Sequence, residues 1–262
     1  MSFLGLIGNA TLGHLGRLRH LMAVTWAVLG LAFRPDSWPR TTRSVLVRQI
    51  VFTGIDALNF VGFVAVLAGI SVVVQAQVWM SRLGQSELLG PLLVTVIVRE
   101  VGPLLVNFIV IGRSATAMAA ELAGMRVRNE VDVLDAQGLD PLLYLVMPRA
   151  ISMATCVLCL TLFFVLVSLG SGYLCGAFLG TSPGDPAIFV RSVVQGVTPI
   201  DFINLLAKTL IPGLLTGVIT AMEGLSIEGV ATDIPQAVTR SVIRSTMALL
   251  SVSVIVSVLS YV

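Results

Sequence analysis

Five long stretches of this chain carry almost no charged side chains. A helix needs about 20 mostly apolar residues to cross the hydrocarbon core of a bilayer, and each stretch is close to that length or longer. Only 11% of all residues are charged, whereas an ordinary soluble domain has about 25%. The sequence therefore predicts an all-α integral membrane protein. We expect a single domain over residues 1–262, with transmembrane helices over 57–81, 88–112, 150–174, 202–222 and 245–262.

The segment before the first predicted span is apolar in part, but its uncharged run is short. Residues 21–33 supply only 13 residues before the next arginine, which is too few to cross. Upstream, apolar residues are opposed by a polar set made of His14, Arg17, Arg19 and His20. We therefore predict a cytoplasmic or interfacial amphipathic region over residues 1–48. A sixth span over residues 21–33 is the alternative.

The distribution of basic residues predicts the orientation of the five spans. Basic residues gather on the cytoplasmic side of membrane proteins. If the N-terminus is cytoplasmic, the outer segments hold only Arg82 and Arg191. The inner segments then hold twelve arginines: 17, 19, 34, 40, 43, 48, 113, 126, 128, 149, 240 and 244. The N-terminus is accordingly expected in the cytoplasm and the C-terminus on the opposite side.

Several classes of chemistry are not expected in this chain. The net charge of +2 is too small to indicate a nucleic-acid partner. Cys156 and Cys159 have C-x-x-C spacing, but no second pair or histidine cluster accompanies them, so we interpret them as small apolar residues in a helix. The only lysine, Lys208, lacks the glycine spacing of a nucleotide-binding P-loop. We predict a non-catalytic chain without metal or cofactor.

Three charged residues nevertheless lie inside predicted spans: Arg99, Glu100 and Lys208. A charge at the bilayer centre costs at least about 2.5–3.5 kcal/mol, so each residue needs a partner or a cavity. Gly102 and Pro103 follow at once and predict a break in the helix beside the charges. Two cations and one anion would suit an amphiphile with an anionic headgroup. A proton-coupled transporter using Glu100, a structural ion pair and a snorkelling lysine remain alternatives.

The inner loop over residues 113–149 is long and looks ordered. Glu130–Gln137 is predicted as a short amphipathic helix with Val131 and Leu134 on one side. Gly138 suits its C-cap, while Asp140 and Pro141 suit the start of the next helix. A short, capped helix on the cytoplasmic side favours docking of a soluble partner. A folded loop without a partner is the alternative.

Three consecutive motifs resemble one known family. They are R-E-x-G-P from Arg99, G-R-x-x-x-A-x-A-A-E-L-x-x-M from Gly112, and E-x-D-x-L-x-x-x-G-x-D-P-x-x-x-L-V-x-P-R from Glu130. A further block runs from Lys208 through EGLSIEGVATDIPQAVTRSVIRS. Together they closely resemble the MlaE/YrbE permeases, the membrane subunits of lipid-transporting ABC systems that work with MCE proteins. The resemblance covers the chain from about Arg48 to its end.

The resemblance implies an MlaE-type ABC permease in the bacterial inner membrane, with the C-terminus in the periplasm. It implies a homodimer, a cytoplasmic ABC ATPase subunit that holds ATP and Mg, and a periplasmic MCE-domain protein. The expected substrate is phospholipid or a related lipid, in support of outer-membrane lipid asymmetry. By resemblance, the lipid cavity is bordered by Arg99, Glu100 and Lys208, and the ATPase contact contains Glu130, Asp132, Leu134 and Gly138. A proton-coupled secondary transporter and a membrane anchor for an assembly are the rival functions.

Overall fold

The computed structural model describes residues 3–34, 38–84, 88–179, 186–227 and 230–261, and the regular structure of this described part is helical throughout. Five helices in it are long and apolar enough to cross a membrane: Arg40–Leu83, Leu89–Val127, Leu142–Phe178, Pro199–Leu225 and Ala231–Ser260. Each of these helices covers one predicted span to within two residues at its ends. The prediction of an all-α membrane protein with five spanning helices is therefore confirmed.

The α-helices follow one another along the chain with short irregular turns between some of them. Their bounds are α1 (Phe3–Ala32), α2 (Arg40–Thr53), α3 (Leu58–Leu83), α4 (Leu89–Leu93), α5 (Gly102–Val110), α6 (Thr116–Val127), α7 (Glu130–Ala136), α8 (Met147–Phe178), α9 (Pro186–Gly196), α10 (Pro199–Leu225) and α11 (Ile234–Tyr261). Short 3-10 turns cover η2 (Ile55–Ala57) and η7 (Ala231–Asp233). Wider π-helical turns cover η4 (Val94–Val101), η5 (Ile111–Ala115) and η6 (Leu142–Val146).

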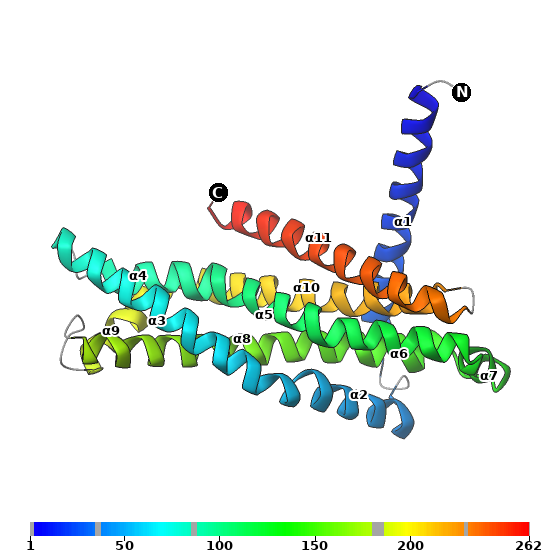
Figure 1. Cartoon of the computed structure of the whole chain (residues 1–262), viewed down its shortest axis with the longest axis horizontal. Coiled ribbons are helices and arrows are strands. Elements are labelled where there is room, and N and C mark those ends of the chain that lie inside the picture. Colours follow the sequence, from blue (N-terminus) through cyan, green and yellow to red (C-terminus); the bar gives the residue numbers. More distant parts are fainter. Residues whose placement is uncertain (1–2, 35–37, 85–87, 180–185, 228–229, 262) are drawn as a thin grey trace.

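The long helices run side by side along the longest dimension of the molecule (Figure 1). α7 lies at one end of this bundle, and α4 and α9 lie at the other. α8 packs against α3 and α10, and α11 packs against α10. The main apolar core lies among α3, α5, α6, α8 and α10, and its fully buried members include Val61, Val106, Met118, Met153 and Phe164.

Small residues allow α8 to approach its neighbours closely. A side chain at Gly172 of α8 would overlap Val73 of α3. On the other side, a Cβ at Gly217 of α10 would lie 2.5 Å from the Cα of Ala150 in α8. Helices inside membranes associate through such close packing because lipid provides little hydrophobic driving force between them. These contacts fix the positions of α3, α8 and α10 relative to one another.

The second span differs from the expectation at Gly102 and Pro103. The helix does not break there: α5 begins at Gly102 and continues without interruption from the π-helical turn η4. Pro103 sits in the first turn of α5, where a missing amide hydrogen is tolerated. The irregular backbone is the widened turn that precedes the proline, and such π-helical turns often occur at functional sites. The prediction of a break was therefore wrong, although the irregularity does coincide with Arg99 and Glu100.

The N-terminal region forms a longer helix than its short apolar run suggests. α1 is continuous over 30 residues, and the apolar part that the structure describes is Arg19–Ala32. Figure 1 shows α1 running across the direction of the long helices, as a helix lying in the membrane plane would. Whether this segment lies in the interface or crosses stays a prediction. Parts of the predicted segments lie outside the described residues, namely 1–2, 35–37, 228–229 and 262.

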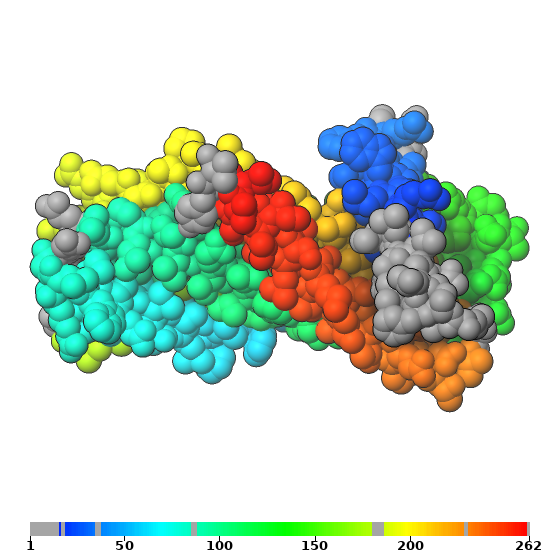
Figure 2. All heavy atoms as spheres, turned by 90° about the horizontal axis from the view of Figure 1, so that it is seen from above, coloured from blue at the N-terminus to red at the C-terminus, as the bar shows by residue number. Residues whose placement is uncertain are grey.

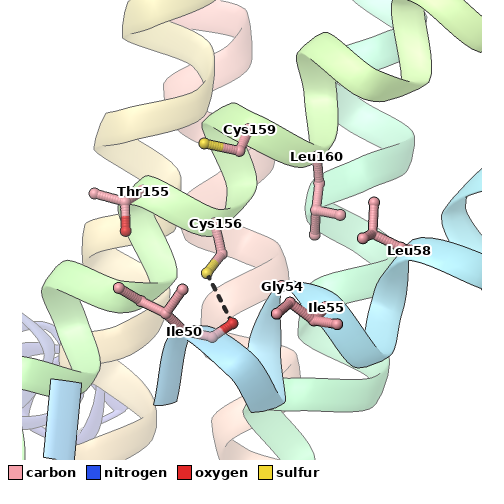
Figure 3. A pocket seen from close by; sticks show the side chains of 8 residues that line it. All are labelled: Ile50, Gly54, Ile55, Leu58, Thr155, Cys156, Cys159 and Leu160. Carbon is pink, nitrogen blue, oxygen red and sulfur yellow. Dashed lines mark hydrogen bonds between the residues drawn. The ribbon is translucent and has the colours of Figure 1, made fainter. Parts of the chain in front are cut away.

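The first span bends where α2 meets α3. Gly54 ends α2 and the turn η2 leads into α3. Against α8, this bend leaves a cavity of about 300 Å³ that is lined almost entirely by apolar groups (Figure 3). The thiol of Cys156 points toward the backbone oxygen of Ile50 at 3.7 Å, while Cys159 lies one turn further along α8. Both thiols are free.

Candidate functional site: a charged cluster between three helices

Lys208 is buried in the described structure, with an exposed fraction of only 2%. Its Nζ donates to Oε1 of Glu100 at 2.6 Å and to the backbone oxygen of Arg99 at 2.9 Å. Ser257 of α11 donates to the same Glu100 oxygen at 2.9 Å. Side chains from η4, α10 and α11 therefore meet at one carboxylate. The alternative of a lysine that snorkels to the membrane surface is wrong.

Lys208 also uses a backbone acceptor in the widened turn η4. Its ammonium donates to the carbonyl of Arg99 at 2.9 Å. Pro103 follows this turn and has no amide hydrogen, so the carbonyls before it have one helical donor fewer. The widened turn and the proline together leave a polar backbone group for a cation from another helix.

Arg99 points to a different partner, Asp201 in the first turn of α10. Its Nε forms an ion pair with Oδ1 of Asp201, whose side chain is almost completely buried. The other carboxylate oxygen, Oδ2, accepts from the amide and hydroxyl of Thr198 at 2.7 and 2.8 Å. This arrangement closes the N-terminus of α10 as a capping box. Asp201 therefore anchors both the start of α10 and an arginine of the second span.

Two buried asparagines connect the same helices. Asn107 of α5 donates to the backbone oxygens of Pro103, at 2.8 Å, and of Lys208, at 3.2 Å. Asn204 of α10 donates to the hydroxyl of Ser260 in α11 at 2.7 Å. An unsatisfied polar group in hydrocarbon costs several kcal/mol, so these bonds hold α5, α10 and α11 in register around the charges.

The charged cluster is defined by Arg99, Glu100, Asp201 and Lys208. Sequence reasoning brought together Arg99, Glu100 and Lys208, and the structure places all three in one site. It missed Asp201, which balances the two cations with a second anion. The expected surplus of positive charge is therefore wrong for this cluster. Glu100 and Arg99 are its more exposed members, with side-chain exposures of 34% and 19%, whereas Lys208 and Asp201 lie behind them.

α11 borders the cluster on one side and is the least buried of the five candidate spans. Figure 2 shows it, from orange to red, lying along one face of the molecule. Its outward face is apolar and contains Val254, Ile255, Val258 and Leu259, each more than half exposed. A polar site inside the bundle is thus adjacent to an apolar face that lipid or another helix can cover.

A second group of predicted residues lies at the end of the bundle, on α7. The predicted short helix is present over Glu130–Ala136, and Gly138 has the positive φ of 77° that suits a C-cap. Asp140 accepts from the amide of Leu142 at 2.9 Å, as predicted for the start of the next helix. The helix and its caps could therefore be predicted from sequence.

Ion pairs fix α7 to the helix before it. Glu130 accepts from Nε of Arg128 at 2.5 Å, and Asp132 pairs with Arg126. The hydrogen bond to Glu130 raises the pKa of the exposed Arg128 above its usual value. Neither pair needs burial to form, and both carboxylates are largely exposed.

The apolar side chains of α7 fall on two sides of the helix. Val131 is buried, and Leu134 packs against the core of its own chain. Val133 is 54% exposed and Leu139 is 43% exposed. These two side chains give this end of the bundle an apolar outer surface. A contact between Leu134 and a partner stays a prediction, but its side chain already has an internal packing role.

Four further ion pairs, in three groups, were not anticipated. Arg149 donates to Glu121 at 2.9 Å. Arg113 lies 3.8 Å from Asp56 and donates to the backbone oxygen of Phe52 at 3.2 Å. Buried Glu223 pairs with two arginines of α11, Arg240 and Arg244. These contacts connect α10 to α11, α6 to α8, and the bend of the first span to η5.

Comparison with known proteins gives a consistent set of relatives. Residues 46–259 match the family model described as Permease MlaE. The chain is 30% identical over 207 residues to a probable ABC transporter permease protein of Rickettsia conorii, covering 79% of each chain. A probable ABC transporter permease protein of Rickettsia felis is 27% identical over 244 residues, covering 93% of this chain and 92% of that one. The chloroplastic protein TRIGALACTOSYLDIACYLGLYCEROL 1 of Arabidopsis thaliana is 28% identical over 200 residues, covering 76% of this chain and 56% of that protein.

Proposed function

This chain belongs to the MlaE family of ABC transporter permeases, and on that premise we propose that it moves phospholipid, or a related lipid, between the inner membrane and a periplasmic MCE protein. Such transport would support the lipid asymmetry of the outer membrane. The observation that carries the proposal is the charged cluster inside the spans, because charged residues at that depth mark a substrate pathway or site. The name of the plant relative, which is that of a glycerolipid, agrees with a lipid substrate.

The cluster can bind a lipid headgroup by exchanging partners. In the described state Glu100 and Asp201 neutralise Lys208 and Arg99. A phosphate that enters beside the more exposed Arg99 and Glu100 would offer the two cations a competing anion with several acceptor oxygens. The apolar faces of the surrounding helices would hold the acyl chains. Specificity for an anionic group would then come from the cations, and release would follow when the carboxylates pair with them again.

The energy for transport would come from a separate subunit. An ABC permease works with an ATPase, which would hold ATP and Mg, and this chain would contribute no catalytic residue. We propose that the ATPase docks at α7, through the exposed Val133 and Leu139 together with Glu130, Asp132 and Gly138, which follows the C-cap. Leu134 would support this surface from beneath. A rigid contact at the end of the bundle could transmit nucleotide-driven movement along α6 and α8.

The remaining parts of the assembly follow from the orientation of the chain. The N-terminus and α7 would lie in the cytoplasm, and α4, α9 and the C-terminus on the periplasmic side of the inner membrane. A second copy of the chain would complete a homodimer, and the apolar outward face of α11 leaves room for one. An MCE-domain protein would cover the periplasmic end.

Purification of the gently solubilised complex tests this function. We expect mass spectrometry to identify an ATPase subunit, an MCE-domain protein and retained phospholipid, and we expect ATP to drive lipid transfer in proteoliposomes. Lipid transfer driven by a proton gradient without any ATPase would instead favour a secondary transporter that uses Glu100. If the complex assembles and transfers lipid fully after the charges of the cluster have been neutralised, the cluster is dispensable. That result would favour a chain that only anchors the assembly in the membrane.

A further inference from the structure

A second polar site lies on α2, far from the charged cluster in sequence. It is a surface pocket of about 340 Å³, lined by Arg40, Thr41, Ser44, Val45, Arg48 and Tyr144. Arg40, Ser44 and Arg48 are spaced four residues apart, so they follow one face of α2. Tyr144 comes from η6, at the start of the third span, and also lines the pocket.

The chemistry of the pocket is that of an anion site. Two guanidiniums, two hydroxyls and a phenol line it, and no carboxylate is among the described lining residues. Neither Arg40 nor Arg48 forms an ion pair with any described carboxylate, although Arg126, Arg128 and Arg149 do. The pocket also includes the first turn of α2, whose amides have no acceptor within the helix and add partial positive charge. A phosphate is the common anion that guanidiniums and hydroxyls recognise together.

The position of the pocket favours a phosphate that belongs to a lipid. Arg48 lies nine residues before Ala57, the first residue of an uncharged run, or about 13 Å along a helix. Arginine side chains are long enough to reach back toward the headgroup region, which extends several ångströms beyond the hydrocarbon. Tyr144 is of a type enriched at membrane interfaces. Basic pockets on the cytoplasmic side of membrane helices bind anionic headgroups.

We propose that this pocket binds the phosphate headgroup of an anionic phospholipid in the cytoplasmic leaflet, at a site separate from the charged cluster. The proposal rests on the proposed orientation and not on the proposed transport function. Its role would be to fix α2, and through it the bend at Gly54, against η6. The positive-inside rule alone explains arginines on this side of the membrane, but it does not place two of them in one pocket with a tyrosine.

Photocrosslinking of the full-length protein tests the site. A benzoylphenylalanine in place of Val45 would sit inside the pocket, and the protein would be reconstituted in vesicles of equal parts phosphatidylglycerol and phosphatidylethanolamine. We expect the lipid adduct to be mainly phosphatidylglycerol. The double variant Arg40→Gln/Arg48→Gln should lose that adduct by about tenfold or more, because it removes both guanidiniums of the pocket lining.

The matched control is Arg34→Gln/Arg43→Gln, which removes the same charge from nearby exposed positions outside the pocket. This control should keep the phosphatidylglycerol adduct. Equal losses in the two variants, or an adduct that simply follows the lipid composition, would overturn the proposal. Displacement of the lipid by millimolar inorganic phosphate would indicate a site for free phosphate, and a protein adduct in cell membranes would indicate a docking surface. Both outcomes would also overturn it. All outcomes are independent of lipid transfer by the charged cluster.

Discussion

The ion pair between Arg99 and Asp201 predicts a strong energetic coupling. Asp201 is almost completely buried and Arg99 is mostly buried, so solvent screens the pair only weakly. Removing one partner of a buried pair costs about 3–5 kcal/mol, because the other charge is left uncompensated. We expect Asp201→Asn to lower the free energy of unfolding by about 3 kcal/mol. The asparagine oxygen can still accept from Thr198, so the capping box need not be lost.

The double variant isolates the pair from other effects of the substitutions. Arg99→Gln/Asp201→Asn removes both charges and leaves two groups that can still hydrogen-bond. We expect it to be more stable than Asp201→Asn alone, with a coupling energy of about 2 kcal/mol in a double-mutant cycle. Unfolding in detergent, measured as loss of helical signal against denaturant, gives the four free energies. If the two single effects add to within about 0.5 kcal/mol, the residues are not coupled and the site has been misread.

Three further predictions concern the ends and the packing of the bundle. Val133→Asp should leave folding unchanged, since the side chain is exposed, but weaken ATPase binding by about tenfold or more; an unchanged binding isotherm would remove α7 from the contact. Gly172→Leu should destabilise the protein by about 1–3 kcal/mol through the α3–α8 packing, whereas Gly170→Leu on the same helix meets open space and should leave stability unchanged. Equal thermal midpoints of the two variants would refute this packing. In a chain without its native cysteines, a membrane-impermeant thiol reagent should label Val197→Cys from the periplasm. It should label Gln137→Cys only after the inner membrane has been permeabilised. The reverse pattern would invert the topology.

Much of the fold could be predicted because it depends on local sequence. Uncharged runs located the spans, since bilayer thickness sets the length of a helix. The short helix at Glu130 could be found from Gly138 and Asp140, because caps act over a few residues. The spacing of Val131 and Leu134 placed them on one side of this helix, but it could not predict that this side packs against the chain itself and leaves Val133 exposed, because tertiary packing decides which side faces inward.

The charged cluster was found only in part for a similar reason. Arg99, Glu100 and Lys208 were conspicuous because they interrupt apolar runs. Asp201 was missed because it stands just outside the run that begins at Phe202. A signal was present: Thr198 followed by Asp201 matches a capping box, which starts the helix earlier. Asp201 then lies seven residues, or two turns, before Lys208 and on the same face. The contribution of α11 through a serine hydroxyl has no such signal and depends on tertiary packing.

The central claim is that the charged cluster acts on lipid during transport. ATP-driven transfer of fluorescent phospholipid by proteoliposomes containing the assembled complex tests it most directly. The variant Glu100→Gln/Lys208→Gln neutralises one pair of the cluster, and Arg113→Gln/Asp56→Asn neutralises a pair outside it. Both should assemble and hydrolyse ATP, but only the first should lose lipid transfer, by tenfold or more. Wild-type transfer by the assembled Glu100→Gln/Lys208→Gln complex would show that the cluster only holds the helices together.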